Sequence, residues 1–177
     1  MTIRQERSSD YPAVYQLVKT SFATASHSDG SEADYLNELR RKDTFIPELS
    51  LVAEMDGKLI GQIVLYKTDI TTPGKTITEL VLSPICVHPD YFRRGIARAM
   101  VEKALRIAGS MDYTAVFLCG EPEIYRRLGF APSHAFGIYH VTDQEKNAAN
   151  DQGVAWCMAR ELIPGALRGI NGTINIE

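Results

Sequence analysis

The stretch Pro84–Met100, PICVHPDYFRRGIARAM, marks the change from strand to helix on which the fold depends. An apolar run ends in a turn that contains proline, and from Ile96 onward apolar residues recur at helical spacing. Arg93, Arg94 and Gly95 lie between the two patterns. Basic residues at the start of a helix oppose the helix dipole, so their presence here calls for a physical reason.

Three strands joined by tight turns are predicted before this stretch. Ser50–Met55 has the pattern of a strand, Asp56-Gly57 is a two-residue hairpin turn, and Leu59–Ile70 is the return strand. After a second turn, Ile77–Val87 forms the third strand. Strands joined in this way form an antiparallel meander.

The pattern after the stretch predicts a crossover. A helix runs from Ile96 to the stop at Gly109-Ser110, and the apolar strand Thr114–Cys119 follows. A strand, helix, strand crossover makes the two strands parallel. Phe136–His140 and Val154–Ala159 are expected to close the sheet. We therefore predict an α/β (α+β) fold in a single domain over residues 1–177, with a mixed, mostly antiparallel sheet flanked by helices.

Composition narrows the classes of function. The 177 residues include 22 acidic and 19 basic side chains, giving a formal net charge of −3, and no long basic run predicts a nucleic-acid partner. Three cysteines, each in an apolar segment, indicate reduced, buried thiols and a cytoplasmic protein. Their spacing fits no metal site. Neither a signal peptide nor a membrane span is expected.

The start of the predicted helix at Ile96 has the properties of a local anion site. Amides in the first turn lack partners within the helix, and the dipole there favours negative charge. Gly95 lets a ligand approach the backbone, and Arg93, Arg94 and Arg98 add positive charge. The alternative is a solvated helix start in which Gly95 only bends the turn. The nucleotide P-loop pattern and the dinucleotide-binding fingerprint are both absent.

Leu82–Ala97 resembles the acyl-CoA-binding motif of the GCN5-related N-acetyltransferase (GNAT) superfamily, a strand followed by [QR]-x-x-G-x-[GA] and a helix. Gly95 and Ala97 fit the last two motif positions, whereas Phe92 stands where the family has Gln or Arg. Glu121–Phe130 is similar to the family's Y-x-x-x-G-F motif. The order of the predicted elements agrees as well, and segments 119–122 and 159–167 resemble the bacterial YhbS-type branch.

The resemblance implies a GNAT fold whose parallel strands splay apart to admit acetyl-CoA as cosubstrate, with no metal. It implies an oxyanion donor near the Ile85 N–H, and a Val87 backbone that pairs with pantetheine like an added strand. Pro84, which removes an N–H from the ladder, is consistent with splaying, although it could be an ordinary edge proline. The residues expected to contact the cofactor are Ile85, Cys86, Val87, Phe92, Arg93, Arg94, Gly95, Ile96, Ala97 and Arg98.

Two residues are predicted to carry the proton transfers of acetyl transfer. Tyr125 lies where the family places its acid tyrosine, and a phenol pKa of about 10 suits reprotonation of a thiolate whose pKa is about 8.5. Glu79 interrupts an apolar strand and is the candidate base, acting through water, with His88 as a weaker choice. The alternatives are a packing tyrosine and a glutamate on the solvent face.

The predicted function is N-acetylation of a primary amine of a small molecule or peptide by direct attack on acetyl-CoA. The alternative is a non-catalytic acyl-CoA binder or sensor of the same fold, which would need neither Tyr125 nor Glu79. The acceptor is not identified, because the acidic segment 27–34 has the composition of a solvated loop, and Tyr35, Tyr66 and Tyr139 suit a core as well as a pocket. A homodimer that pairs through the closing strands is possible, and the sequence does not determine the oligomeric state.

Overall fold

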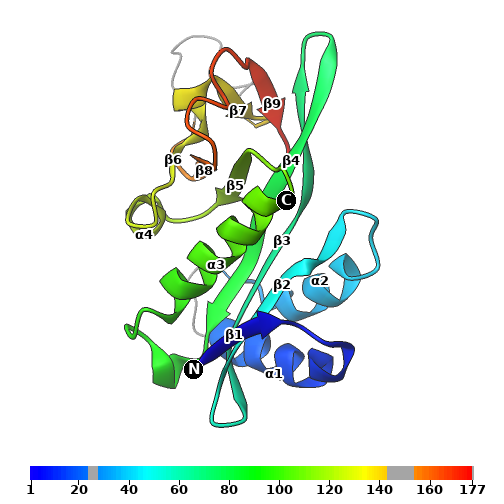
Figure 1. Cartoon of the computed structure of the whole chain (residues 1–177), viewed down its shortest axis with the longest axis vertical. Helices are drawn as coiled ribbons and strands as arrows, with labels where there is room; N and C mark the ends of the chain where they lie inside the picture. The colour runs from blue at the N-terminus through cyan, green and yellow to red at the C-terminus, as the bar shows by residue number, and fades with distance from the viewer. Residues whose placement is uncertain (24–27, 143–153, 177) are drawn as a thin grey trace. The chain divides into compact units, whose positions relative to one another are not determined.

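A computed structural model describes residues 1–23, 28–142 and 154–176 of the protein (Figure 1). The chain forms two compact units. The first unit comprises residues 1–66 and 83–107, and the second comprises residues 67–82 and 108–177. Because the long strands β3 (Lys58–Thr72) and β4 (Lys75–Val87) contribute residues to both units, neither unit is a continuous segment. A single domain over the whole chain stays a prediction.

The predicted antiparallel meander corresponds to β2 (Phe45–Met55), β3 and β4, which are neighbours in this order in the sheet. β2 pairs with β3 antiparallel, and β1 (Thr2–Gln5) pairs with the other edge of β2. The turn between β2 and β3 has a φ of 51° at Asp56 and 75° at Gly57. Positive φ at both central residues is what a tight hairpin of this kind requires, so the sequence predicts this turn correctly.

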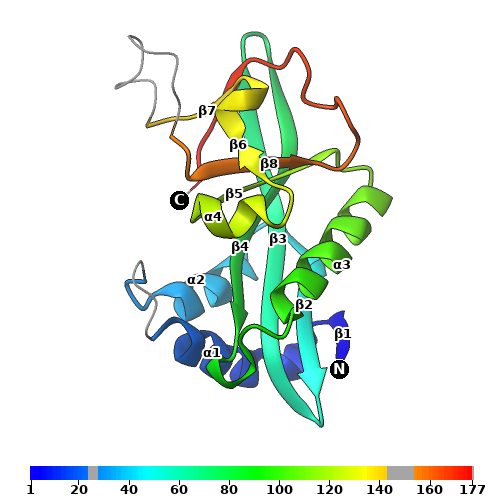
Figure 2. The same ribbon diagram turned by 90° about the vertical axis from the view of Figure 1, so that its left-hand side faces the viewer.

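The helices of the first unit cover both faces of its strands, as Figure 2 shows. On one face lie α1 (Tyr11–Phe22) and α2 (Glu32–Leu39). On the other face lies α3 (Ile96–Ser110), packed so closely that a Cβ at Gly61 would come within 2.8 Å of Cε of Met100. The core cluster between these two helices and the strands consists of Val14, Leu17, Val18, Ala33, Leu36, Leu39, Val52, Val64 and Cys86.

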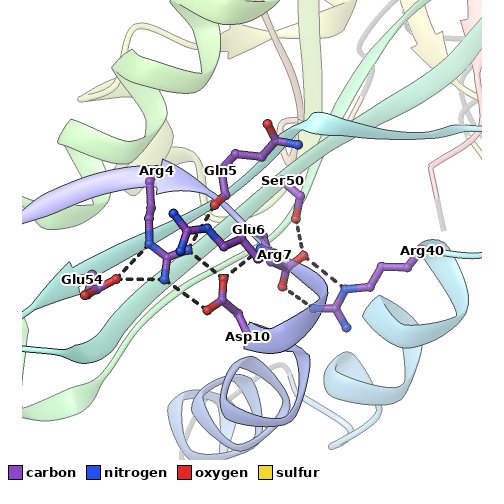
Figure 3. Close-up of polar contacts among 8 residues, drawn as sticks. All are labelled: Arg4, Gln5, Glu6, Arg7, Asp10, Arg40, Ser50 and Glu54. Carbon is purple, nitrogen blue, oxygen red and sulfur yellow. Dashed lines mark hydrogen bonds and ion pairs between the residues drawn. The ribbon is translucent and has the colours of Figure 1, made fainter.

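Two arginine–carboxylate clusters anchor β1 and the loop after it (Figure 3). The Arg4 guanidinium donates to Glu54 at 2.8 Å and to Asp10 at 2.7 Å. Next to it, the buried carboxylate of Glu6 accepts hydrogen bonds from the Arg40 guanidinium. The hydrogen bond from Arg4 holds the pKa of Asp10 below its ordinary value. The N-terminal strand is therefore fixed by charge as well as by its ladder.

The second unit contains the parallel pair. β4 pairs with β5 (Ala115–Cys119) through Leu80 and Val116 and through Val81 and Phe117. The strand order is β1-β2-β3-β4-β5-β8-β6. The remaining elements are α4 (Pro122–Arg126), β6 (Ala131–Pro132), β7 (Ile138–His140), β8 (Cys157–Glu161) and β9 (Gly172–Ile174), with β9 paired to β3 and β7. The predicted fold class is thus confirmed.

The closing strands differ from their predicted bounds. Phe136 lies in a short 3-10 helix, so the first closing strand contains only Ile138–His140. The second closing strand is Cys157–Glu161, whereas Val154–Ala159 was expected. β6 and β9 have two and three residues, too few to show alternation in sequence. The polar segment 143–153 lies outside the described residues. Within the described parts of the chain, no helix has the length and apolar character to cross a bilayer.

Candidate functional site

The loop between β4 and α3, residues 92–98, is called the anion loop here, and its backbone conformation is unusual. The φ angles of Arg93 and Gly95 are 62° and 76°, both in the left-handed region. Such a conformation is uncommon for a residue with a side chain, and it occurs where successive N–H groups form an anion-binding concavity. The first bond of α3 runs from the Ala99 N–H to the Gly95 carbonyl at 3.0 Å. In general the amides of a helix's first turn have no acceptor one turn earlier, so a helix start can offer N–H groups to an anion.

The side chains of the anion loop are largely exposed. Arg93, Arg94 and Arg98 are exposed, while Ile96 is buried and anchors the helix start. Arg94 donates to the Asp90 carbonyl at 3.1 Å, and its guanidinium lies 5.1 Å from the ring centre of Tyr91. Part of this positive charge is thus used to brace the loop.

Phe92, which departs from the family motif, is 54% exposed. Phe92 therefore does not belong to the buried core. Ala97 is half-buried on the first turn of α3. The departure from the motif therefore affects the surface that a ligand would meet and not the loop's backbone.

The end of β4 is partly accessible. Ile85 is half-buried, whereas Cys86 and Val87 are buried. Burial raises the pKa of the Cys86 thiol to about 12. This thiol is consequently protonated at neutral pH and is a poor nucleophile. The paired residues of the β4–β5 ladder end at Val81, before Pro84, as the predicted splaying requires.

Tyr125 is half-buried on α4, and its ring rests on the backbone of Gly120. A Cβ built on Gly120 would lie 2.3 Å from Cε2 of Tyr125, closer than any two such atoms approach. The edge of the Tyr125 ring also meets Phe130, with ring centres 6.0 Å apart. Burial raises the pKa of the Tyr125 phenol, so the hydroxyl keeps its proton and can donate it.

Glu79 is buried and its carboxylate is occupied by the start of β5. Oε2 accepts the N–H of Thr114 and the N–H of Ala115, each at 3.1 Å, and Oε1 accepts the Thr114 hydroxyl. The alternative of a glutamate on the solvent face is therefore wrong. These contacts favour a structural role, in which Glu79 holds β5 against β4.

The two predicted catalytic residues lie toward opposite ends of β5. Glu79 contacts Ala115, the first residue of the strand, whereas Tyr125 rests on Gly120, just beyond its last residue, Cys119. At about 3.3 Å per residue, Ala115 and Cys119 are about 13 Å apart. Glu79 as the base stays a prediction, and it would require a chain of water molecules.

The three tyrosines considered for an acceptor pocket differ in their surroundings. The hydroxyls of Tyr35 and Tyr66 are hydrogen-bonded at 2.8 Å beside the core under α2, and Tyr139 is half-buried on β7. Cys119 is exposed, so the expectation that every cysteine is buried is wrong for this residue. The contact between Gly120 and Tyr125 has no signature in the sequence, because it depends on how α4 folds back.

Comparison with known proteins identifies the family. The acetyltransferase (GNAT) domain matches residues 2–133. The chain belongs to the GNAT family. It is 30% identical over 111 residues to the uncharacterized N-acetyltransferase YjhQ of Escherichia coli and 27% identical over 140 residues to the N-acetyltransferase Eis of Mycobacterium tuberculosis. These matches cover 62% and 75% of this chain, but only 60% of YjhQ and 33% of Eis.

Solved structures agree with this assignment. The GNAT N-acetyltransferase YhbS of E. coli, solved with CoA, has a TM-score of 0.81 and 25% identity, with coverage of 99% of this chain and 89% of YhbS. A GNAT acetyltransferase of Brucella melitensis, solved with acetyl-CoA, has a TM-score of 0.74 and 22% identity, with coverage of 99% and 95%. The GNAT family and the YhbS-like fold, both expected from the sequence, are thus confirmed.

Proposed function

We propose that this GNAT protein transfers an acetyl group from acetyl-CoA to a primary amine of a small molecule or peptide by direct attack. The left-handed conformation of Arg93 and Gly95 at the start of α3, within the family's acyl-CoA motif, is the observation that carries the proposal. The E. coli and Brucella relatives solved with CoA and acetyl-CoA support the same cosubstrate.

The anion loop is proposed to hold the phosphates of coenzyme A. Backbone amides of a nest at a helix start bind anions without side-chain rearrangement, and exposed arginines add long-range attraction. The bound anion would offset the cost of placing basic side chains at the positive end of the dipole. The proposed contacts are Ile85, Cys86, Val87, Phe92, Arg93, Arg94, Gly95, Ile96, Ala97 and Arg98, with Ile85–Val87 at the acyl and pantetheine end.

Tyr125 is proposed to protonate the thiolate of coenzyme A as it leaves. Its raised pKa keeps the phenol protonated at neutral pH, so a proton is available to the developing thiolate. The amine must lose a proton too, because only about one alkylammonium in 10³ to 10⁴ is deprotonated at neutral pH. Water carries that proton away, with Glu79 as the predicted final acceptor.

Direct attack is favoured over an acyl-enzyme because the cysteines are poorly suited to nucleophilic attack. Burial raises the pKa of Cys86 to about 12, and a hydrogen bond to Cys157, together with burial, raises the pKa of Cys119. A thiol must be ionised to attack a thioester at a useful rate. The amine of the acceptor is therefore the proposed nucleophile.

Thiol release from acetyl-CoA across a panel of polyamines, amino acids, aminoglycosides and peptides tests the function. Turnover with at least one amine is expected. Tyr125→Phe should lower kcat by about 10² to 10⁴, as the loss of a general acid does, whereas Tyr113→Phe removes a hydroxyl from the same unit and should not. Full turnover by Tyr125→Phe would overturn the assignment of the acid.

Calorimetry with coenzyme A alone tests the anion loop. Binding without thiol release from any amine would indicate the non-catalytic binder, and no binding would overturn both functions. A cytoplasmic location and pairing of two copies through the closing strands belong to the same proposal. Cell fractionation and light scattering test them.

A further inference from the structure

Cys119 and Cys157 face each other across two neighbouring strands. Cys119 is the last residue of β5, and the register places it directly opposite Cys157, the first residue of β8. The N–H of Gly120 donates to the carbonyl of Trp156 at 2.9 Å. A bond between the residues that flank a pair in this way marks a non-hydrogen-bonded pair, in which the Cα atoms are only about 4.5 Å apart.

This spacing suits a disulfide bond. Cα atoms about 4.4 to 6.8 Å apart can be bridged without a large backbone movement. The register also places the two side chains on the same face of the sheet. Cys119 is exposed and Cys157 is fully buried. An oxidant can therefore reach the Cys119 thiol, whereas the Cys157 thiol is shielded from solvent. Exposure of one partner is typical of disulfides that are reduced again readily.

The pair is one residue from the contact that positions Tyr125. Gly120 follows Cys119 directly, and the Tyr125 ring lies against its Cα with no room for a methyl group. A disulfide of about 2.05 Å is shorter than any hydrogen-bonded contact between two sulfur atoms. Closing it draws the Cys119 side chain toward Cys157, and any accompanying shift of the Cys119–Gly120 backbone moves the surface that supports Tyr125.

We propose that Cys119 and Cys157 form a reversible disulfide that displaces Tyr125 and slows acetyl transfer. The effect on transfer rests on the proposed function. The oxidant is a small-molecule disulfide. The Cys119 thiolate attacks one of its sulfur atoms and releases one thiolate, forming a mixed disulfide. The Cys157 thiolate then attacks the sulfur of Cys119 and releases the second. Two protein thiols are oxidised, and one small disulfide is reduced to two thiols, which take up the two protons.

The reaction is expected to be slow. The contact with Cys157 and burial raise the pKa of the Cys119 thiol, so little thiolate is present at neutral pH. Prolonged exposure to the oxidant is therefore needed. Disulfides of reducing compartments are usually transient ones of this sensing kind.

The test uses the whole chain, incubated with oxidised glutathione and then digested. Trypsin places Cys86, Cys119 and Cys157 on three separate peptides, 76–93, 107–126 and 147–160, so the linkage is read directly by mass spectrometry. We expect peptides 107–126 and 147–160 to be joined, with two hydrogen atoms lost. Trp156 is the chain's only tryptophan and precedes Cys157, so quenching of its fluorescence by the new disulfide gives a second readout.

Thiol release measured on the same samples tests the effect on Tyr125. Oxidation should lower kcat by roughly 10-fold to 10²-fold, as small displacements of catalytic groups do, and a reductant should restore it. Cys119→Ser should have the kcat of the reduced protein, and oxidised glutathione should not change it. Cys157→Ser should hold glutathione on Cys119 as a mixed disulfide without forming the crosslink.

The outcomes separate this inference from the proposed function. If peptides 107–126 and 147–160 stay unlinked after prolonged oxidation while Cys119 remains accessible to an alkylating reagent, the disulfide is refuted. A linked protein with unchanged kcat refutes the effect on Tyr125 and leaves acetyl transfer standing. If none of the amines in the panel makes the reduced protein release thiol from acetyl-CoA, the proposed function fails. The mass spectra and the fluorescence still show whether the disulfide forms.

Discussion

Gly95 in the first unit and Gly120 in the second are both required, for opposite reasons. Gly95 has a φ of 76°, and a Cβ there would meet no atom of the described protein within 4 Å. The space it leaves is open to a ligand. At Gly120 the space is filled by the ring of Tyr125. One glycine leaves open space beside the backbone, and the other makes room for the protein's own side chain.

The difference shows how far a motif describes a site. The conformation of the anion loop is a local property of a short segment, and the amides proposed to bind the phosphates are ones that any sequence able to adopt the conformation would supply. The position of Tyr125 depends on β5, the turn after it and α4 together. Substitutions at the two glycines should therefore damage different quantities, ligand affinity in one unit and kcat in the other.

Of the two glycine substitutions, Gly120→Ala should have the larger effect. The added methyl group would overlap Cε2 of Tyr125, so the ring must leave its place, and kcat should fall about 10-fold to 10²-fold in the thiol-release assay. Gly109→Ala is the matched control, because it adds a methyl group to α3 where nothing lies within 4 Å. Equal kcat values for the two variants would show that the contact at Gly120 does not position Tyr125 for turnover.

Gly95→Ala should weaken the binding of coenzyme A by roughly 10-fold. Alanine in the left-handed region costs about 1 to 2 kcal/mol, and its methyl group obstructs approach to the amides. Calorimetry measures the affinity. Gly74→Ala is the control, since Gly74 also has a positive φ, 96°, and open surroundings, but it lies in the turn between β3 and β4. The comparison would break if both variants bound coenzyme A like the parent.

Glu79→Gln should lower the free energy of unfolding by about 1 to 3 kcal/mol. The amide can no longer accept all three hydrogen bonds from Thr114 and Ala115, and a buried donor is left unsatisfied. Urea denaturation measures the loss, with the exposed Glu48→Gln as control. If Glu79 is the final proton acceptor proposed above, the acidic limb of the pH–rate profile should also shift. An unchanged profile would leave Glu79 with the structural role alone.

Asp10→Asn should have the smallest effect, about 1 kcal/mol or less, because the ion pair with Arg4 is partly exposed. Since Arg4 lowers the pKa of Asp10, its stabilisation is present above the unfolded pKa of about 3.9 and is lost as the pH falls through the folded value. Unfolding free energies measured down the acid range should therefore decline less steeply in the variant. Asp112→Asn, away from Arg4, should follow the parent.

Much of the fold could be predicted from sequence because its signals are local. The Asp56-Gly57 turn, the helical spacing from Ile96 and the crossover to β5 each depend on a few neighbouring residues. The predicted bounds of strands were less accurate where pairing with a distant strand determines where a strand begins and ends. β8 begins at Cys157 because it pairs with β5 there, and β9 exists only through its pairing with β3 and β7.

The site divides in the same way. The sequence locates the anion loop from Arg93, Gly95 and the helix that follows. It selects Glu79 because a charge interrupts an apolar strand, but the bonds to Thr114 and Ala115 join residues 35 and 36 positions apart, which no local pattern reveals. The exposure of Cys119 likewise follows from its place at the end of β5 and not from its apolar neighbours.

The pairing of β9 with β3 has a consequence for how the protein is made. Ile70 lies opposite Ile174, more than a hundred residues later, so the edge of β3 that pairs with β9 can be covered only after residues 173 and 174 have been synthesised. Contacts this distant in sequence form slowly, because a long loop must close before they contribute. During synthesis the strands and helices of the first unit can assemble on the ribosome. The second unit is completed only after β9 has been synthesised.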